Sequence, residues 1–242
     1  MVVSEKYKYV FIELYFTGST AIHEELCECY DGHPVQKKHA KYHRFLQSAT
    51  KEEKQYFAFS GIRNPMDMVV SQYVKLKSNH KGEFTDPSNW IKSGGTMKFY
   101  GTALKLYHDI HTNHLSFKDY FYKYYKLPYD NWSRLAHEDF DYVIRFENIQ
   151  SDFAKVLEKL NIEQKRDLPT RNKTQGKKDF TTYYDTPEMR ARAVYIFGPF
   201  MKKWNYDFPE EWNIKKTPFV SAFLFKVFSI PRYVYWRYIT KR

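Results

Sequence analysis

The chain has 242 residues, of which 43% are hydrophobic and 28% are charged, a balance that excludes a disordered or fibrous protein. Aromatic residues make up 19% of the chain, and 39 lysines and arginines against 28 aspartates and glutamates give a formal net charge of +11. Such an excess favours an anionic partner: nucleic acid, a membrane surface, or a sulfated or phosphorylated ligand.

The cysteine content and the N-terminal segment bear on the compartment. The two cysteines, Cys27 and Cys29, supply neither a disulfide framework nor a four-cysteine zinc site. The first residues lack the charge and hydropathy order of a signal peptide, and no stretch reaches the roughly 18 uncharged apolar residues needed to span a bilayer. We therefore expect a reducing, cytoplasmic location, with membrane association on the cytoplasmic face as an option.

Short apolar runs alternate with helical segments along the chain. Strands are predicted over residues 7–14, 34–38, 56–62 and 141–146. Helices are predicted over residues 21–30, 65–77, 151–160 and 187–204. Alternation of this kind indicates an α/β fold in which a parallel sheet carries helices on both faces, in three layers. Residues 80–135 fit this alternation poorly and are expected to form a helical insertion within a domain spanning residues 1–212.

An anion-binding turn is predicted where the first strand meets its helix. Thr17, Gly18, Ser19 and Thr20 follow the strand and open the helix. The amides of Gly18 to Ala21 would point at an anion with the helix dipole behind them, and the hydroxyls would add donors. The Gly-Lys-Ser/Thr ending of a Walker A loop is absent. A capped strand-to-helix turn without any ligand is the alternative.

A second anion-binding position is predicted at the end of the strand over 56–62. Arg63 ends this strand, and Ser71 lies eight residues later, about two helical turns along the next helix. An arginine at the carboxyl end of a strand can hold a phosphate with two parallel hydrogen bonds. Taken alone, Arg63 is equally well explained by a salt bridge at a sheet edge.

Both junctions resemble motifs of a known family. Residues 11–22 resemble the 5′-phosphosulfate loop of sulfotransferases that use 3′-phosphoadenosine 5′-phosphosulfate (PAPS), and residues 62–73 resemble their 3′-phosphate site. Residues 143–162 and 168–209 are similar to the later strand, helix and closing segment of the family. The resemblance extends in order over about residues 7–210 and is closest to the carbohydrate sulfotransferases of the heparan and chondroitin type.

The resemblance implies a P-loop-like sulfotransferase fold and transfer of a sulfuryl group from PAPS to a hydroxyl, with a carbohydrate as the expected acceptor. The nucleotide product would be 3′,5′-adenosine bisphosphate. By this resemblance Thr17–Ala21 bind the 5′-phosphosulfate, and Arg63 and Ser71 bind the 3′-phosphate. Lys173 and Lys177 lie in the segment that closes over the nucleotide.

One position departs from the family pattern. Members usually carry a lysine just before the Thr-Gly pair, where it stabilises the bridging oxygen as the sulfuryl group leaves, and this chain has Phe16 there. Either another cation supplies that stabilisation, or activity is reduced or absent. The candidates are Lys37, Lys38, His39 and His43, which lie at the end of the second predicted strand and in the segment after it.

A base must take the proton of the acceptor hydroxyl, and a histidine with a pKa near neutrality suits this step. His39 is the first candidate and His43 the second, each weighed against an ordinary surface histidine of a basic loop. Glu13, on the first predicted strand, is an alternative base or a paired carboxylate near the core. His108, His111 and His114 recur every third residue, but no metal is expected because no acidic or cysteine partner completes a site.

The last thirty residues form a basic aromatic tail. Residues 213–242 contain no aspartate or glutamate and seven lysines and arginines, among many aromatic and aliphatic residues. This segment either lies in a membrane interface or packs as helices on the catalytic domain. Two further hypotheses compete with an active enzyme: a sulfotransferase-like protein that binds nucleotide or glycan without turnover, and a basic peripheral membrane protein. No nucleic-acid-binding motif is present.

Overall fold

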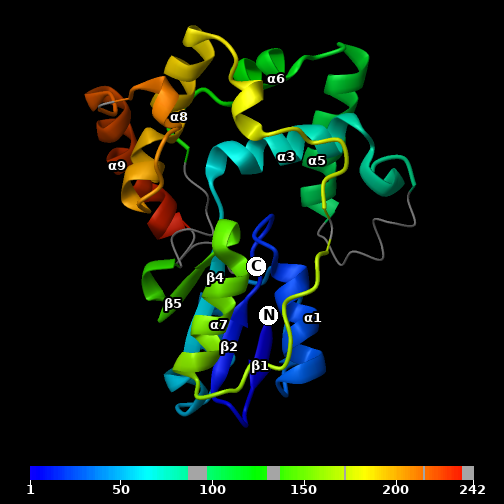
Figure 1. The fold of residues 1–242 in the computed structure, drawn as a ribbon, viewed down its shortest axis with the longest axis vertical. Coiled ribbons are helices and arrows are strands. Elements are labelled where there is room, and N and C mark those ends of the chain that lie inside the picture. Colours follow the sequence, from blue (N-terminus) through cyan, green and yellow to red (C-terminus); the bar gives the residue numbers. More distant parts are fainter. Residues whose placement is uncertain (87–96, 130–136, 172, 215, 236–242) are drawn as a thin grey trace. The chain divides into compact units, whose positions relative to one another are not determined.

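The computed structural model describes residues 1–86, 97–129, 137–171, 173–214 and 216–235 (Figure 1). The chain divides into two compact units. The first, the sheet unit, comprises Met1–Arg63 and Asn131–Lys173, and the second, the helical unit, comprises Asn64–Asp130 and Thr174–Arg242. The predicted boundary between residues 212 and 213 falls inside the helical unit.

The sheet unit contains a mixed, open sheet of five strands in the order β3-β1-β2-β4-β5. The strands are β1 (Val2–Ser4), β2 (Tyr9–Ile12), β3 (His33–Pro34), β4 (Phe57–Ile62) and β5 (Tyr142–Arg145). β2, β4 and β5 are parallel, whereas β1 runs antiparallel to both β2 and β3. The prediction of an all-parallel sheet is therefore wrong at this edge. Residues 5–8 are too few for the crossover that a parallel β1–β2 pair would require.

Alternating side chains of the strands face opposite sides of the sheet, as a period of two requires. Tyr9, Phe11 and Phe59 pack against α1 (Ser19–Cys29) and α7 (Ile149–Lys159) on one face. On the other face Val10, Ile12 and Ala58 pack against Tyr42 and Phe45 of α2 (Tyr42–Ser48). Both faces are thus covered by helices, and the carboxyl ends of β2 and β4 are left to the loops that lead into α1 and α3 (Figure 1).

The helical unit holds α3 (Pro65–Lys77), α5 (Met97–Thr112), α6 (Phe117–Tyr124), α8 (Pro187–Lys203) and α9 (Phe219–Val234). The described residues of the two units also form short 3-10 helices at Glu53–Gln55, His80–Gly82, Phe146–Asn148, Phe180–Tyr183 and Glu210–Trp212. The described part of the predicted insertion over residues 80–135 is helical in α5 and α6. Residues 87–96 and 130–136 of that insertion lie outside the described residues.

Two of these helices begin as the sequence predicts, because a capping side chain precedes a proline in each. The Asn64 side chain accepts a hydrogen bond from the Met66 amide at 2.9 Å, and Pro65 opens α3. The Thr186 hydroxyl accepts from the Met189 amide at 3.3 Å at the start of α8. Such caps satisfy amides that have no partner within the helix.

Aromatic rings make up much of the core of the helical unit. Phe121 of α6 meets Tyr184 edge-on with ring centroids 5.4 Å apart and lies 5.8 Å from Phe197 of α8. Phe117 approaches Tyr184 at 5.2 Å. Such pairs contribute beyond the area they bury, which gives the high aromatic content a structural role in this unit.

Candidate functional site

The turn between β2 and α1 has an unusual backbone. Phe16 and Gly18 both have positive φ, at 64° and 75°. At Gly18 a side chain is excluded for a second reason, since a Cβ there would lie 2.4 Å from the Ile149 side chain. Gly61 of β4 is equally confined, because a Cβ there would lie 2.8 Å from the Thr17 Cβ. Two glycines therefore let the turn lie close against the end of β4 and the start of α7.

The hydrogen bonds of the turn divide the groups that were predicted to donate hydrogen bonds to an anion into two sets. The Thr17 hydroxyl donates to the Leu14 carbonyl at 3.0 Å, and the Ala21 amide donates to the Gly18 carbonyl at 3.0 Å. The Ala21 amide, which was predicted to donate to an anion, thus donates within the first turn of α1 instead. The amides of Gly18, Ser19 and Thr20 lie at the N-terminus, where a helix offers no carbonyl partner. They are the donors that an anion at this helix end would meet.

A cation lies at the same helix end. The Lys38 ammonium donates to the Thr20 hydroxyl at 3.1 Å, so its charge is held at the first turn of α1. Lys37 is also exposed, but its side chain donates no hydrogen bond to the residues that the structure describes. Of the two lysines predicted as substitutes for the one missing at position 16, the structure places Lys38 at the turn.

Arg63 approaches the turn from the end of β4. Its Nη1 donates to the Phe16 carbonyl at 3.1 Å, and its guanidinium lies over the Phe146 ring at 4.0 Å. Stacking and the hydrogen bond hold the half-buried guanidinium in one place. Ser71 belongs to α3 in the helical unit and is fully buried. Its joint role with Arg63 toward a 3′-phosphate stays a prediction.

His39 has the environment of a neutral base. Its ring stacks on Tyr15 with centroids 3.7 Å apart, and its Nδ1 lies 3.2 Å from the Glu13 carbonyl oxygen. A carbonyl can only accept, so Nδ1 carries the proton and Nε2 keeps its lone pair. Burial lowers the pKa of His39 from its ordinary value to about 4, and the imidazole is therefore neutral at pH 7.

A comparison with models of known protein families gives a match over the part of the chain that holds these features. A model of the sulfotransferase family matches residues 1–199, which include the β2–α1 turn, Lys38, His39 and Arg63. The chain belongs to the sulfotransferase family. Membership supports sulfotransfer as the reaction class and supports a transferase. Comparisons with curated proteins and with solved structures found no match to this chain.

The remaining base candidates of this sulfotransferase differ in their surroundings. Glu13 is buried, and its carboxylate pairs with the Met1 amino nitrogen and lies 3.1 Å from Nδ1 of His23. A buried carboxylate paired with the amino group of Met1 is explained by the fold itself. His43 is half-buried in the first turn of α2. His39 has a backbone hydrogen bond and a lowered pKa.

The two lysines predicted to close over the nucleotide lie in different units. Lys173 is exposed at the end of the sheet unit. Lys177 belongs to the helical unit and forms an ion pair with Asp67 in the first turn of α3. Asp67 is thus one partner that a nucleotide phosphate would have to replace or share at Lys177.

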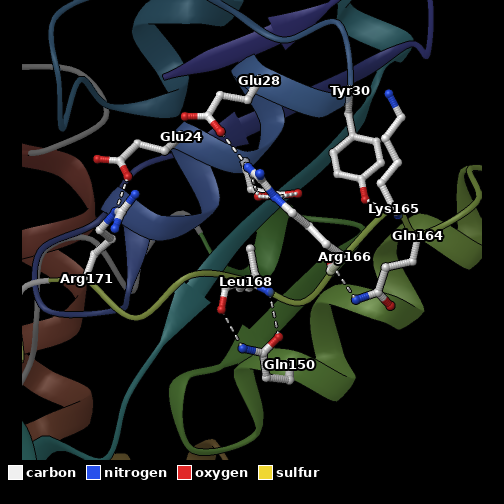
Figure 2. Close-up of polar contacts among 10 residues, drawn as sticks. Glu24, Glu28, Tyr30, Gln150, Gln164, Lys165, Arg166, Leu168 and Arg171 are labelled. Carbon is white, nitrogen blue, oxygen red and sulfur yellow. Dashed lines mark hydrogen bonds and ion pairs between the residues drawn. The ribbon is translucent and has the colours of Figure 1, made fainter.

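A polar network that the sequence did not reveal ties the segment over residues 164–171 to α1 and α7 (Figure 2). Arg166 pairs with the fully buried Glu25 at 2.9 Å and with Glu28 at 2.5 Å. The Gln150 side chain exchanges hydrogen bonds with both backbone groups of Leu168, at 2.8 and 2.9 Å. In the sequence, this network is visible only as acidic residues on one predicted helix and basic residues about 140 positions later.

Of the three histidines spaced by three residues, His108 and His111 lie in α5, and His114 lies after its end. His111 lies with Nε2 3.2 Å from the Leu76 carbonyl and with its ring 4.3 Å from that of Tyr107. Among the described residues no group of three or more histidines, cysteines, aspartates and glutamates is placed to hold a metal ion.

Proposed function

We propose that this protein transfers a sulfuryl group from PAPS to a hydroxyl group and releases 3′,5′-adenosine bisphosphate. The observation that carries the proposal is the convergence of two cationic side chains on one helix N-terminus. Lys38 bonds the Thr20 hydroxyl, and Arg63 bonds the Phe16 carbonyl, each at 3.1 Å. We further propose that the sheet and its helices form the three-layer, P-loop-like arrangement of this family.

The negative charge of PAPS explains why the β2–α1 turn suits this sulfuryl donor. The nucleotide carries a 5′-phosphosulfate and a 3′-phosphate, and both are anionic. The amides of Gly18, Ser19 and Thr20 and the dipole of α1 present partial positive charge, and the ammonium of Lys38 adds a full charge beside them. We assign the 5′-phosphosulfate to this turn and the 3′-phosphate to Arg63 with Ser71.

The reaction needs little covalent chemistry from the protein. The acceptor oxygen bonds to sulfur, the bond from sulfur to the bridging phosphate oxygen breaks, and the electron pair of that bond stays on the nucleotide. In our proposal Nε2 of His39 takes the acceptor proton, and Lys38 stabilises the charge left on the bridging oxygen. The Nε2 lone pair can accept this proton at pH 7, but a pKa of about 4 makes His39 a weaker base than a histidine with a pKa near neutrality.

The acceptor class rests on the resemblance of residues 11–22 and 62–73 to carbohydrate sulfotransferases. We propose a carbohydrate hydroxyl, with the helical insertion over residues 80–135 on the acceptor side. The main alternative is a protein that binds the nucleotide but turns it over slowly or not at all, and Phe16 in the lysine position favours it.

Two measurements on the full chain separate these possibilities. Calorimetry with 3′,5′-adenosine bisphosphate and with adenosine monophosphate tests the site, and tighter binding of the bisphosphate is expected. Transfer of labelled sulfate from PAPS to a panel of glycans, lipids and small alcohols tests the reaction. Nucleotide binding without transfer to any acceptor would favour the binding protein, and equal affinity for both nucleotides would contradict the donor site.

A further inference from the structure

The C-terminal helix α9 contacts α8 at a backbone carbonyl that a proline leaves without its helical hydrogen bond. Pro199 lies inside α8 and has no amide hydrogen, so the carbonyl four residues earlier, that of Tyr195, loses its helical donor. The Ser221 hydroxyl of α9 donates to this carbonyl. Gly198 admits the approach, because a Cβ there would lie 2.6 Å from Cγ2 of Thr217. The first part of the tail is therefore docked on the helical unit.

The side of α9 that faces away from this contact is apolar and exposed. The buried residues of α9 are Ser221 and Phe225, on the side that faces α8. On the opposite side, five apolar residues spaced by four, four, three and four positions fall within about 80° of the helix circumference at 100° per residue. This exposed stripe consists of Phe219, Phe223, Val227, Ile230 and Val234, which are between 42% and 82% exposed.

The charged residues of the segment that carries the exposed stripe are all basic. From Asn213 to the end of the chain there are seven lysines and arginines and no aspartate or glutamate. Lys226 is exposed within α9 itself. A large apolar stripe on a folded surface marks a contact with a partner or a membrane, and an acid-free basic margin selects an anionic one.

We propose that α9 lies in the interface of an anionic lipid bilayer, with the exposed stripe in the acyl boundary and Lys226 and its neighbours at the headgroups. A helix of 16 residues is about 24 Å long, less than the roughly 30 Å of a hydrocarbon core. In agreement, no helix among the described residues is sufficiently long and apolar to cross a bilayer. Pairing of two copies through the stripe would bring two acid-free basic segments together, which disfavours a dimer.

The test uses the full chain and vesicles of phosphatidylcholine with and without phosphatidylserine. The wild-type protein should sediment with the phosphatidylserine vesicles, and added salt should release it several-fold because the attraction is screened. The double variant F223S/I230S should lose binding at unchanged melting temperature and unchanged nucleotide affinity, since both side chains are exposed. Lys226→Glu should weaken binding to the anionic vesicles alone.

A matched control carries the same chemical change elsewhere. Val35→Ser with Leu127→Ser also removes two exposed apolar side chains, and vesicle binding should persist. The proposal is overturned if the wild-type protein stays in solution with both vesicle types, or if F223S/I230S binds as the wild type does. It is equally overturned if the wild type is a dimer in solution that F223S/I230S converts to a monomer without any vesicle binding.

Discussion

Replacing Lys38 by alanine should reduce sulfuryl transfer far more than replacing its neighbour Lys37. The two lysines are adjacent and exposed, but only the Lys38 ammonium is held at the β2–α1 turn, 3.1 Å from the Thr20 hydroxyl. The pair Lys38→Ala and Lys37→Ala removes the same charge from the same loop. Long-range effects of net charge therefore cancel in the comparison, and the difference reports the contact at the helix end.

The expected magnitude follows from the position of the charge. Two unit charges about 4 Å apart attract by about 1 kcal/mol in bulk water and about 4 kcal/mol at an effective dielectric constant near 20. Lys38 is exposed before the nucleotide binds, and bound nucleotide excludes water from the turn, so a value between these limits applies. About 2.7 kcal/mol corresponds to a hundredfold change in rate, the usual effect of removing one such donor.

Single-turnover transfer from labelled PAPS at saturating nucleotide measures the step directly. Lys38→Ala should slow it about a hundredfold, and Lys37→Ala should change it less than about threefold. Adding Phe16→Lys to the Lys38→Ala variant should recover part of the loss, because the charge returns to the family position. The reasoning is refuted if Lys37→Ala is the damaging change, or if Lys38→Ala leaves the rate of single turnover intact.

Three further outcomes are expected. Arg63→Ala should remove most of the preference for 3′,5′-adenosine bisphosphate over adenosine monophosphate, about 2–4 kcal/mol in calorimetry, and a variant that keeps the preference would exclude Arg63 from the 3′-phosphate site. The pKa of His39 is about 4 in the folded chain and about 6.5 in the unfolded chain. Between pH 6.5 and pH 4 only the unfolded chain binds this proton, so the free energy of unfolding decreases as the pH drops through this range. Urea unfolding should show a loss of about 1–2 kcal/mol from pH 7 to pH 5 that His39→Gln abolishes, and an equal loss in both proteins would contradict the assignment. Arg166→Ala, which leaves the buried Glu25 without its partner, should lower the melting temperature more than Arg171→Ala does at the exposed pair with Glu24, and equal shifts would show that the network adds nothing.

The elements predicted correctly are those that local sequence determines. Residues 56–62 are a continuous apolar run, and Asn64 and Pro65 stop it with a helix cap, so β4 and α3 lie where the sequence places them. The α8 start at Thr186 and Pro187 is equally local. In each case a capping side chain and a proline within two residues of each other mark the boundary.

The features that were missed depend on contacts distant in sequence. Val2–Ser4 pairs with both β2 and β3, and three residues carry too little pattern to reveal an antiparallel edge. The pairing of Arg166 with Glu25 joins positions about 140 residues apart, and neither side shows a local sign of it. The candidate site shows the same limit: Thr17–Thr20 and Arg63 are predicted from motif spacing, but only the fold shows the contact of Lys38 with Thr20.

Position 16 is where the site departs from the family pattern. In the resembling motif this position supplies a cation through its side chain, which a phenylalanine cannot do. In this chain Phe16 has φ of 64°, and its backbone carbonyl accepts the hydrogen bond of Arg63. The position thus contributes backbone that fixes one cation, while a second cation reaches the helix end from Lys38. In our proposal the positive charge that sulfuryl transfer needs comes from two other segments of the sheet unit, and the rate of the Lys38→Ala variant measures how much of it comes from the loop after β3.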